Sequence, residues 1–141
     1  MCLSLKQKML KDDIKELFNN LKNDRIGFRI SQNIAKLIEA KTNNIFISAY
    51  DIKNHQAKNI KRGIGYIDYY NAAQALISGE FFAVFKDGEY HTILLSEHEN
   101  IYRIVLKVSK NKKEIFMPSV VKITDLENEV QKLARNKKQI K

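Results

Sequence analysis

Few side chains of this 141-residue sequence can exchange protons near neutral pH, and the three histidines are the main candidates. His98 stands between two glutamates in an expected turn, which is typical of a surface residue. His91 lies in an apolar strand and is interpreted as a packing or surface residue. His55 lies in a polar segment over residues 51–58 and is the candidate acid or base.

The neighbours of His55 have opposite effects on the protonation of its imidazole. In a helix Asp51 would lie one turn before His55, and Lys58 would lie on the same face one turn after it. A carboxylate nearby favours a protonated imidazole, and a cation disfavours it. The local sequence therefore leaves the charge of His55 open, and an exposed polar helix without chemistry is the alternative interpretation.

A second set of candidates follows the strand expected over residues 101–108. Alternation places Arg103 and Lys107 on one face, about 13–14 Å apart at the rise of a strand. The other face carries Tyr102, Ile104, Leu106 and Val108, which we expect to cover the helices. Two separated cations could follow a phosphodiester backbone or could form the solvated face of a one-sided sheet. Ser119 adds a hydroxyl on the next strand.

Other kinds of chemistry lack the residues that they need. The chain has no His-x-x-x-His, no Asp-x-Asp and no carboxylate cluster with the spacing of metal ligands. Gly63-Ile-Gly65 lacks the flanking strand and the further glycine of a phosphate-binding loop. The single cysteine, Cys2, excludes a disulfide framework and a cysteine zinc site. The sequence thus predicts no metal and no cofactor, and any enzyme mechanism would be metal-independent.

Composition and charge favour a single domain with an anionic partner. Apolar residues make up 44% of the chain, and 25 Lys and Arg against 16 Asp and Glu give a net charge of +9. Five of these cations follow Glu129, so about half of the excess lies in a basic C-terminal tail. No segment has the apolar core of a signal peptide or the length of a membrane span, so we expect a soluble, cytoplasmic protein without a membrane partner.

Periodicity and turn residues predict an α+β fold. N-terminal helices would pack on a four-stranded antiparallel β-meander, followed by a C-terminal basic helix. The expected helices cover residues 3–21, 31–41, 50–61 and 69–78, with a strand at 44–48 and meander strands at 81–85, 90–95, 101–108 and 114–123. Ser48-x-x-Asp51 resembles a capping box that begins the third helix, and Gly79 would end the fourth. From Phe81 the period of the apolar residues changes from 3.6 to 2. Pro118 would force the last strand to an edge or a bulge. The chain divides into a helical segment (1–43), a core (44–123) and a basic helix or tail (124–141).

Four short motifs in the core occur in an order that resembles a known group of nucleases. The motifs are Ile45-Phe-Ile-Ser48, Lys53-x-His55-x-x-Lys58, Tyr102-Arg-x-Val-x-Lys107 and a last strand with Ser119. This order resembles the phage-type nucleases of the barnase–EndoU–colicin–RelE group, over residues 44–123.

The resemblance implies a phage or toxin ribonuclease that needs no metal. The 2′-hydroxyl of RNA, which could be a tRNA, would attack the adjacent phosphate and leave a cyclic phosphate. The resemblance implies that His55 is the acid or base and that Arg103 and Lys107 bind the phosphate. Further implied roles are added charge from Lys53 or Lys58 and orientation of the phosphate by Ser119 or Tyr102. An antitoxin, immunity protein or host protein would be a further partner.

Two other classes of function fit the same sequence. One is a non-catalytic basic module that binds nucleic acid or an acidic host protein, as phage takeover or inhibitor proteins do. The other is an adaptor that keeps the nuclease fold without its activity. An enzyme needs His55, Arg103 and Lys107 in one cleft, whereas a binding module needs only the summed charge. The role of residues 1–43, as a neutralising segment, a docking segment or part of the core, is left open.

Overall fold

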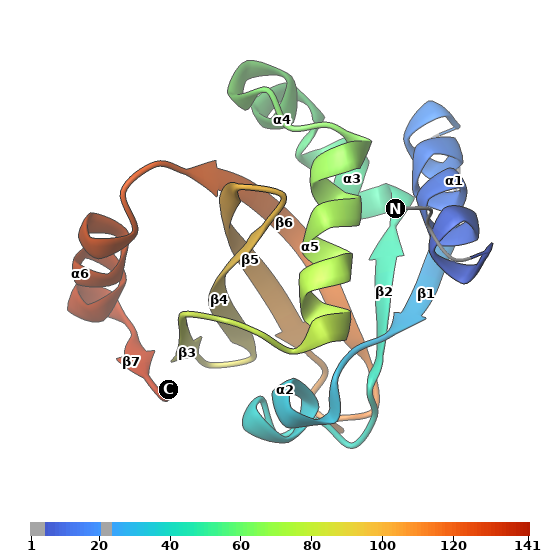
Figure 1. The fold of residues 1–141 in the computed structure, drawn as a ribbon. Coiled ribbons are helices and arrows are strands. Elements are labelled where there is room, and N and C mark those ends of the chain that lie inside the picture. The colour runs from blue at the N-terminus through green and yellow to red at the C-terminus, as the bar shows by residue number, and fades with distance from the viewer. Residues whose placement is uncertain (1–4, 21–23) are drawn as a thin grey trace.

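A computed structural model describes residues 5–20 and 24–141, with side chains from residue 10 onward (Figure 1). Both ends of the first predicted helix, Leu3 and Leu21, lie outside the described residues. The helices are α1 (Leu5–Asn19), α2 (Gln32–Leu37), α3 (Ala49–Asn54), α4 (Gln56–Arg62), α5 (Tyr66–Ser78) and α6 (Leu126–Asn136). The strands are β1 (Arg25–Arg29), β2 (Asn44–Ser48), β3 (Ala83–Asp87), β4 (Tyr90–Glu97), β5 (Asn100–Val108), β6 (Ile115–Ile123) and β7 (Lys138–Gln139).

The strands of the described ranges form one seven-stranded mixed sheet in the order β1-β2-β6-β5-β4-β3-β7. All neighbours are antiparallel except β2 and β6, which run parallel. The α+β class predicted from the sequence is confirmed, but the sheet is larger than the four antiparallel strands expected. The difference arises because β1, β2 and β7 join through pairings between segments far apart in the chain, which local periodicity does not contain.

One face of the sheet, here called the helical face, carries the main core (Figure 1). The residues of β5 predicted to cover the helices are fully buried there, from Tyr102 to Val108. Ile14 of α1 and Ile34 of α2 share this core with Ile52 of α3 and Leu76 of α5. Residues 10–38 therefore contribute to the same core as the strands.

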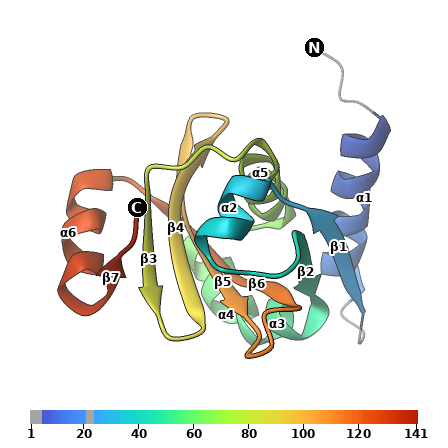
Figure 2. The ribbon, with the colours of Figure 1, turned by 90° about the horizontal axis from the view of Figure 1, so that it is seen from below.

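The opposite face, here called the open face, is covered only at one end. Leu133 of α6 is buried against Ala83, Phe85 and Leu94, with Ile123, Leu126 and Val130 packed beside it. β7 then pairs with β3, so α6 and β7 lie at the end of the sheet opposite to α1 and β1 (Figure 2). The predicted basic tail is thus a helix and a short strand, and the open face between β1 and β4 lacks a helix from the described residues.

Two predicted chain signals near α3 and α5 are confirmed. The Ser48 hydroxyl accepts a hydrogen bond from the Asp51 N–H at 3.1 Å, which begins α3. Gly79 ends α5 with a φ of 84°, and a Cβ there would lie 2.5 Å from the Ser31 hydroxyl oxygen. Only glycine combines this backbone conformation with this close approach.

Helix boundaries differ from the prediction in three places. α2 ends at Leu37, four residues before the predicted end. The helix expected over residues 50–61 is divided at His55 into α3 and α4. α5 begins after Gly65 rather than at Asp68, because the Asp68 carboxylate accepts a hydrogen bond from the Gly65 N–H at 2.9 Å, from one turn inside the helix. Among the described residues, no helix is both long and apolar enough to span a membrane.

His91 on β4 is buried on the helical face, with 1% of its surface exposed. Its Nδ1 atom has no hydrogen-bond partner among the described residues. Burial, together with the charges of Lys86 and Lys112 and against the opposing effect of Glu39, lowers the pKa of His91 to about 4. The fold therefore holds a neutral imidazole.

We predict that His91 makes the protein less stable in mild acid. The unfolded chain binds a proton near pH 6.5 and the folded chain only near pH 4, so the unfolding free energy falls as the pH decreases through this range. The loss should be on the order of 2–3 kcal/mol. Urea unfolding followed by circular dichroism between these pH values measures it.

The matched control is His98→Gln, because His98 is exposed. This variant should keep the acid sensitivity of the wild type, and His91→Gln should lose the part that histidine contributes. An equal pH slope in the wild type and His91→Gln would contradict the prediction.

Candidate active site

A pocket of about 580 Å³ opens on the open face, where β2 ends and α3 begins. It collects three of the site residues predicted from the sequence, His55, Lys107 and Ser119, from three separate elements. The other lining residues are Ser48, Tyr50, Asp51, Tyr90, Val105, Phe116 and Pro118. The pocket thus joins residues that lie more than sixty positions apart in the chain.

A bulge in β6 sets the direction of Ser119. Ser119 pairs with Val105 and Phe116 pairs with Lys107, so β6 uses three residue steps where β5 uses two. The extra residue lies at Met117–Pro118, which confirms the bulge predicted for Pro118 and not the edge position. Without it, Phe116 and Ser119 would point to opposite faces, and only one of them would line the pocket.

The turn from β2 into α3 places His55 on the other side of the pocket. The Ser48 cap begins α3 at the end of β2, and α3 ends one and a half turns later at His55. The His55 backbone N–H donates to the Asp51 carbonyl oxygen at 3.1 Å, and the Nδ1 atom lies 2.8 Å from the same oxygen.

The Asp51 carbonyl fixes the tautomer of His55. A carbonyl oxygen can only accept, so Nδ1 carries the hydrogen in this contact. In the neutral ring Nε2 then has a free lone pair and can accept a proton. The ring is half-buried. The arrangement suits a general base whose orientation is held by the backbone.

Lys107 supplies the positive charge of the pocket. It is exposed on the open face of β5, and its ammonium nitrogen lies 5.8 Å from the centre of the Tyr90 ring on β4. Tyr90 pairs directly with Lys107 in the sheet, and 43% of its surface is exposed. The ammonium therefore lies near the pocket and forms no ion pair with an acidic side chain of the described residues.

Two predicted site residues on β5 lie elsewhere. The Arg103 guanidinium forms an ion pair with Glu129 of α6, which is 6% exposed. Arg103 thus holds α6 against the sheet and does not line the pocket. Tyr102 is fully buried on the helical face, and a buried phenol has no surface to offer RNA. The alternation of β5 separates Tyr102 from Lys107.

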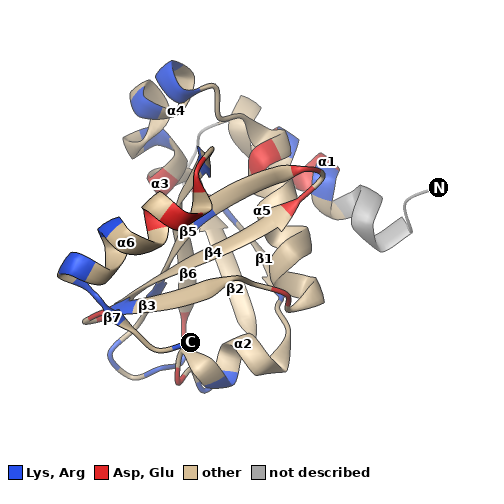
Figure 3. Cartoon of the chain, turned by 60° about the vertical axis from the view of Figure 1, so that its left-hand side comes forward, with Lys and Arg blue, Asp and Glu red and all other residues tan. Residues whose placement is uncertain are grey.

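Lys53 and Lys58 lie outside the pocket as well. Both are exposed, on α3 and α4, and neither is among the lining residues. Because the helix divides at His55, the spacing of three residues to Lys58 does not give a continuous helix face. Lys58, Lys61 and Arg62 make α4 a basic projection of the molecule (Figure 3).

Several lining residues were given no role at a site from the sequence. Ser48 ended one of the nuclease-like motifs, Asp51 was considered as a neighbour of His55, and Tyr50 and Tyr90 were only members of a helix and a strand. The register of the β4–β5 hairpin was a usable signal for Tyr90, because it places Tyr90 opposite Lys107. Tyr50 lies in the first turn of α3, lines the pocket and is 70% exposed.

Within residues 5–20 and 24–141, no group of three or more His, Cys, Asp or Glu side chains could hold a metal ion. No family model, curated protein or solved structure matches the chain at a significant level. The resemblance to the barnase–EndoU–colicin–RelE group therefore stays a prediction from the sequence motifs.

We predict a structural role for the Tyr102 hydroxyl. It donates to the Asp68 carboxylate at 2.8 Å and accepts from the Asn71 amide at 3.0 Å, which ties β5 to α5. Burial raises the pKa of Tyr102 to about 12. Tyr102→Phe leaves two buried partners without this contact, so the unfolding free energy should fall by about 1–3 kcal/mol in urea denaturation.

Tyr50→Phe is the matched control, because 70% of Tyr50 is exposed. Its unfolding free energy should stay within about 0.5 kcal/mol of the wild type, as for most surface substitutions. Equal stability of Tyr102→Phe and Tyr50→Phe would contradict the structural role.

Proposed function

We propose that the protein is a metal-independent ribonuclease that cleaves RNA by attack of the 2′-hydroxyl on the adjacent phosphate. The observation that carries the proposal is the pocket, in which a histidine, a lysine and a serine from three elements converge. The reaction needs a base for the 2′-hydroxyl, an acid for the leaving oxygen and a positive charge near the phosphate. The sequence motifs of residues 44–123, which contain these three residues, also support the proposal.

In the proposed reaction Nε2 of His55 takes the proton from the 2′-hydroxyl. The 2′-oxygen forms a bond to phosphorus, and the bond from phosphorus to the 5′-oxygen breaks. The leaving oxygen takes a proton from the Lys107 ammonium. The products are a 2′,3′-cyclic phosphate and a 5′-hydroxyl, and water returns the proton from His55 to Lys107.

Each group has a reason to act in this role. His55 presents Nε2 as the acceptor because Nδ1 is bound to the Asp51 carbonyl. Lys107 offsets the negative charge that develops on the phosphate, which is worth most in a site partly closed to water. The Ser119 hydroxyl, on the strand next to Lys107, can donate to a phosphate oxygen.

We predict that the purified protein cleaves bulk tRNA or mRNA in the presence of EDTA. Fragment ends should carry cyclic phosphate, detected by mass spectrometry. His55→Ala should lower the cleavage rate by about 10²–10⁴-fold, as expected for loss of a general base. Lys107→Gln should also lower the rate, because its charge and proton are lost.

His98→Gln and Lys110→Gln are the matched controls, because both residues are exposed and neither lines the pocket. Both should cleave at the wild-type rate. If the RNA stays intact but binds in a salt-sensitive manner, and His55→Ala does not change this binding, the protein is a nucleic-acid-binding module and not a ribonuclease. RNA that is neither cleaved nor retained would point to a protein partner.

A further inference from the structure

A row of aromatic side chains crosses the open face and passes the pocket. Tyr90 pairs with Lys107, Lys107 with Phe116, and Phe116 with Phe46. Directly paired residues lie on the same face of a sheet, so these four side chains form one line across β4, β5, β6 and β2. We infer that this line, here called the aromatic row, binds the bases of an unpaired RNA strand.

Two pairs of neighbouring side chains in the aromatic row lie close together. The centres of the Phe46 and Phe116 rings are 6.0 Å apart, and the Lys107 ammonium lies 5.8 Å from the Tyr90 ring. At the far end the Arg25 guanidinium of β1 stacks on Phe46, 4.1 Å from its centre. From Tyr90 to Phe46 the row spans three strand spacings, about 14 Å.

A glycine makes room for Phe46. Gly27 pairs with Phe46 on β1, and a Cβ at Gly27 would lie 3.1 Å from the Phe46 ring. The ring therefore lies over the backbone of β1 and under Arg25. Phe46 and Phe116 are half-buried on this face, so part of each ring is accessible. At Phe46 the Arg25 guanidinium lies over the ring and offers a further plane on which a base can stack.

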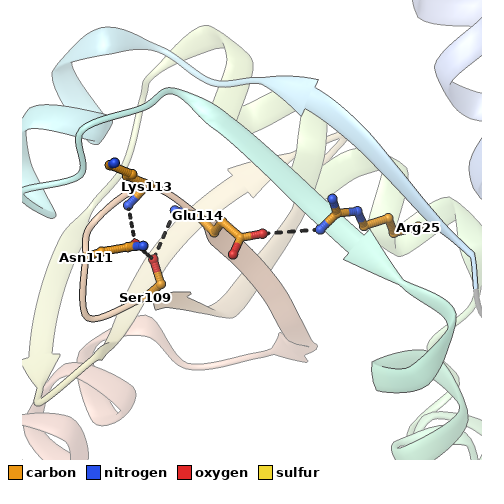
Figure 4. A network of polar contacts seen from close by, with 5 residues as sticks. All are labelled: Arg25, Ser109, Asn111, Lys113 and Glu114. Carbon is orange, nitrogen blue, oxygen red and sulfur yellow. Dashed lines mark hydrogen bonds and ion pairs between the residues drawn. The ribbon is translucent and has the colours of Figure 1, made fainter.

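The charges around the aromatic row favour a phosphate backbone. Arg25, Arg29 and Lys107 are exposed on the same face. Glu114 pairs with Arg25 at 3.3 Å across β2, and the turn before β6 holds it in place through a bond from its N–H to the Ser109 hydroxyl (Figure 4). The pair holds the Arg25 guanidinium next to the Phe46 ring, whereas Arg29 and Lys107 can contact phosphates.

This chemistry selects an unpaired strand. Bases stack on exposed aromatic rings only when they are not paired, and a sheet face with such rings stacks two or three bases. A double helix would hide its bases and offer phosphates alone. The inference rests on the proposed function, because a strand lying on the aromatic row brings a phosphate to Lys107 at the mouth of the pocket that holds His55.

The test measures binding apart from cleavage. The probe is a short fluorescein-labelled 2′-O-methyl RNA of mixed sequence, which lacks the attacking hydroxyl, and its duplex with the complementary strand. Fluorescence anisotropy should show tighter binding of the single strand. Phe46→Leu and Tyr90→Leu, which keep apolar volume without a stacking ring, should each weaken single-strand binding about five-fold or more and leave duplex binding unchanged.

Phe82→Leu is the matched control, because Phe82 is an exposed aromatic residue outside the aromatic row, and it should bind as the wild type does. Circular dichroism of each variant shows that the fold is intact. Equal binding of single strand and duplex, or wild-type binding by both row variants, would overturn the inference. Selective single-strand binding without cleavage of ordinary RNA would instead overturn the proposed function and leave the aromatic row as a binding surface.

Discussion

The parallel pairing of β2 with β6 is the contact on which the rest of the molecule depends. Two residue pairs make it, Ile45 with Ile115 and Phe46 with Phe116. Both isoleucines are fully buried in the main core, so apolar burial supports a short hydrogen-bonded ladder. Through this ladder β1, β2 and the helices that follow join the antiparallel strands. The pocket exists because β2 then turns away into α3 while β6 continues past it.

The two faces of β5 have different roles, because successive side chains of a strand point to opposite faces. On the helical face Tyr102 is held by Asp68 and Asn71 of α5. On the open face Arg103 holds α6, and Lys107 is left for the pocket. One strand therefore fixes a helix on each side of the sheet and still presents a cation. The bulge in β6 completes this division, because it brings a hydroxyl to the same side as that cation.

Sequence analysis found the local features and missed the long-range ones. The Ser48 cap, the Gly79 helix end and the bulge at Pro118 follow from backbone chemistry of a few residues, which a sequence displays directly. The break at His55 did not, because polar residues on both sides suit a continuous helix. The α+β class followed from the change of period near Phe81, whereas no periodicity reveals that β2 lies beside β6.

The site residues likewise divide into those that could be predicted from local sequence and those that depend on long-range packing. Alternation correctly separated Tyr102 from Lys107, and the resemblance nevertheless gave both a role at the phosphate. Arg103 shares a face with Lys107, but its ion pair with Glu129 depends on where α6 packs, which its sequence does not state. The positions of Tyr90 and Phe46 on the open face follow only from the register of the strand pairs. The type of a residue indicated which chemistry its side chain could perform. Whether that side chain faces the pocket depends on the pairing of the neighbouring strands.

The parallel pairing also determines when the pocket can form during synthesis. The paired residues of β2 and β6 lie about seventy positions apart, and Ser119 follows them. A growing chain carries His55 long before it carries the strands that complete the pocket, and non-local pairs of this kind form late in folding. While the ribosome is still making the chain, His55 has neither Lys107 nor Ser119 beside it. The pocket can therefore form only after the residues of β6, up to Ser119, have left the ribosome.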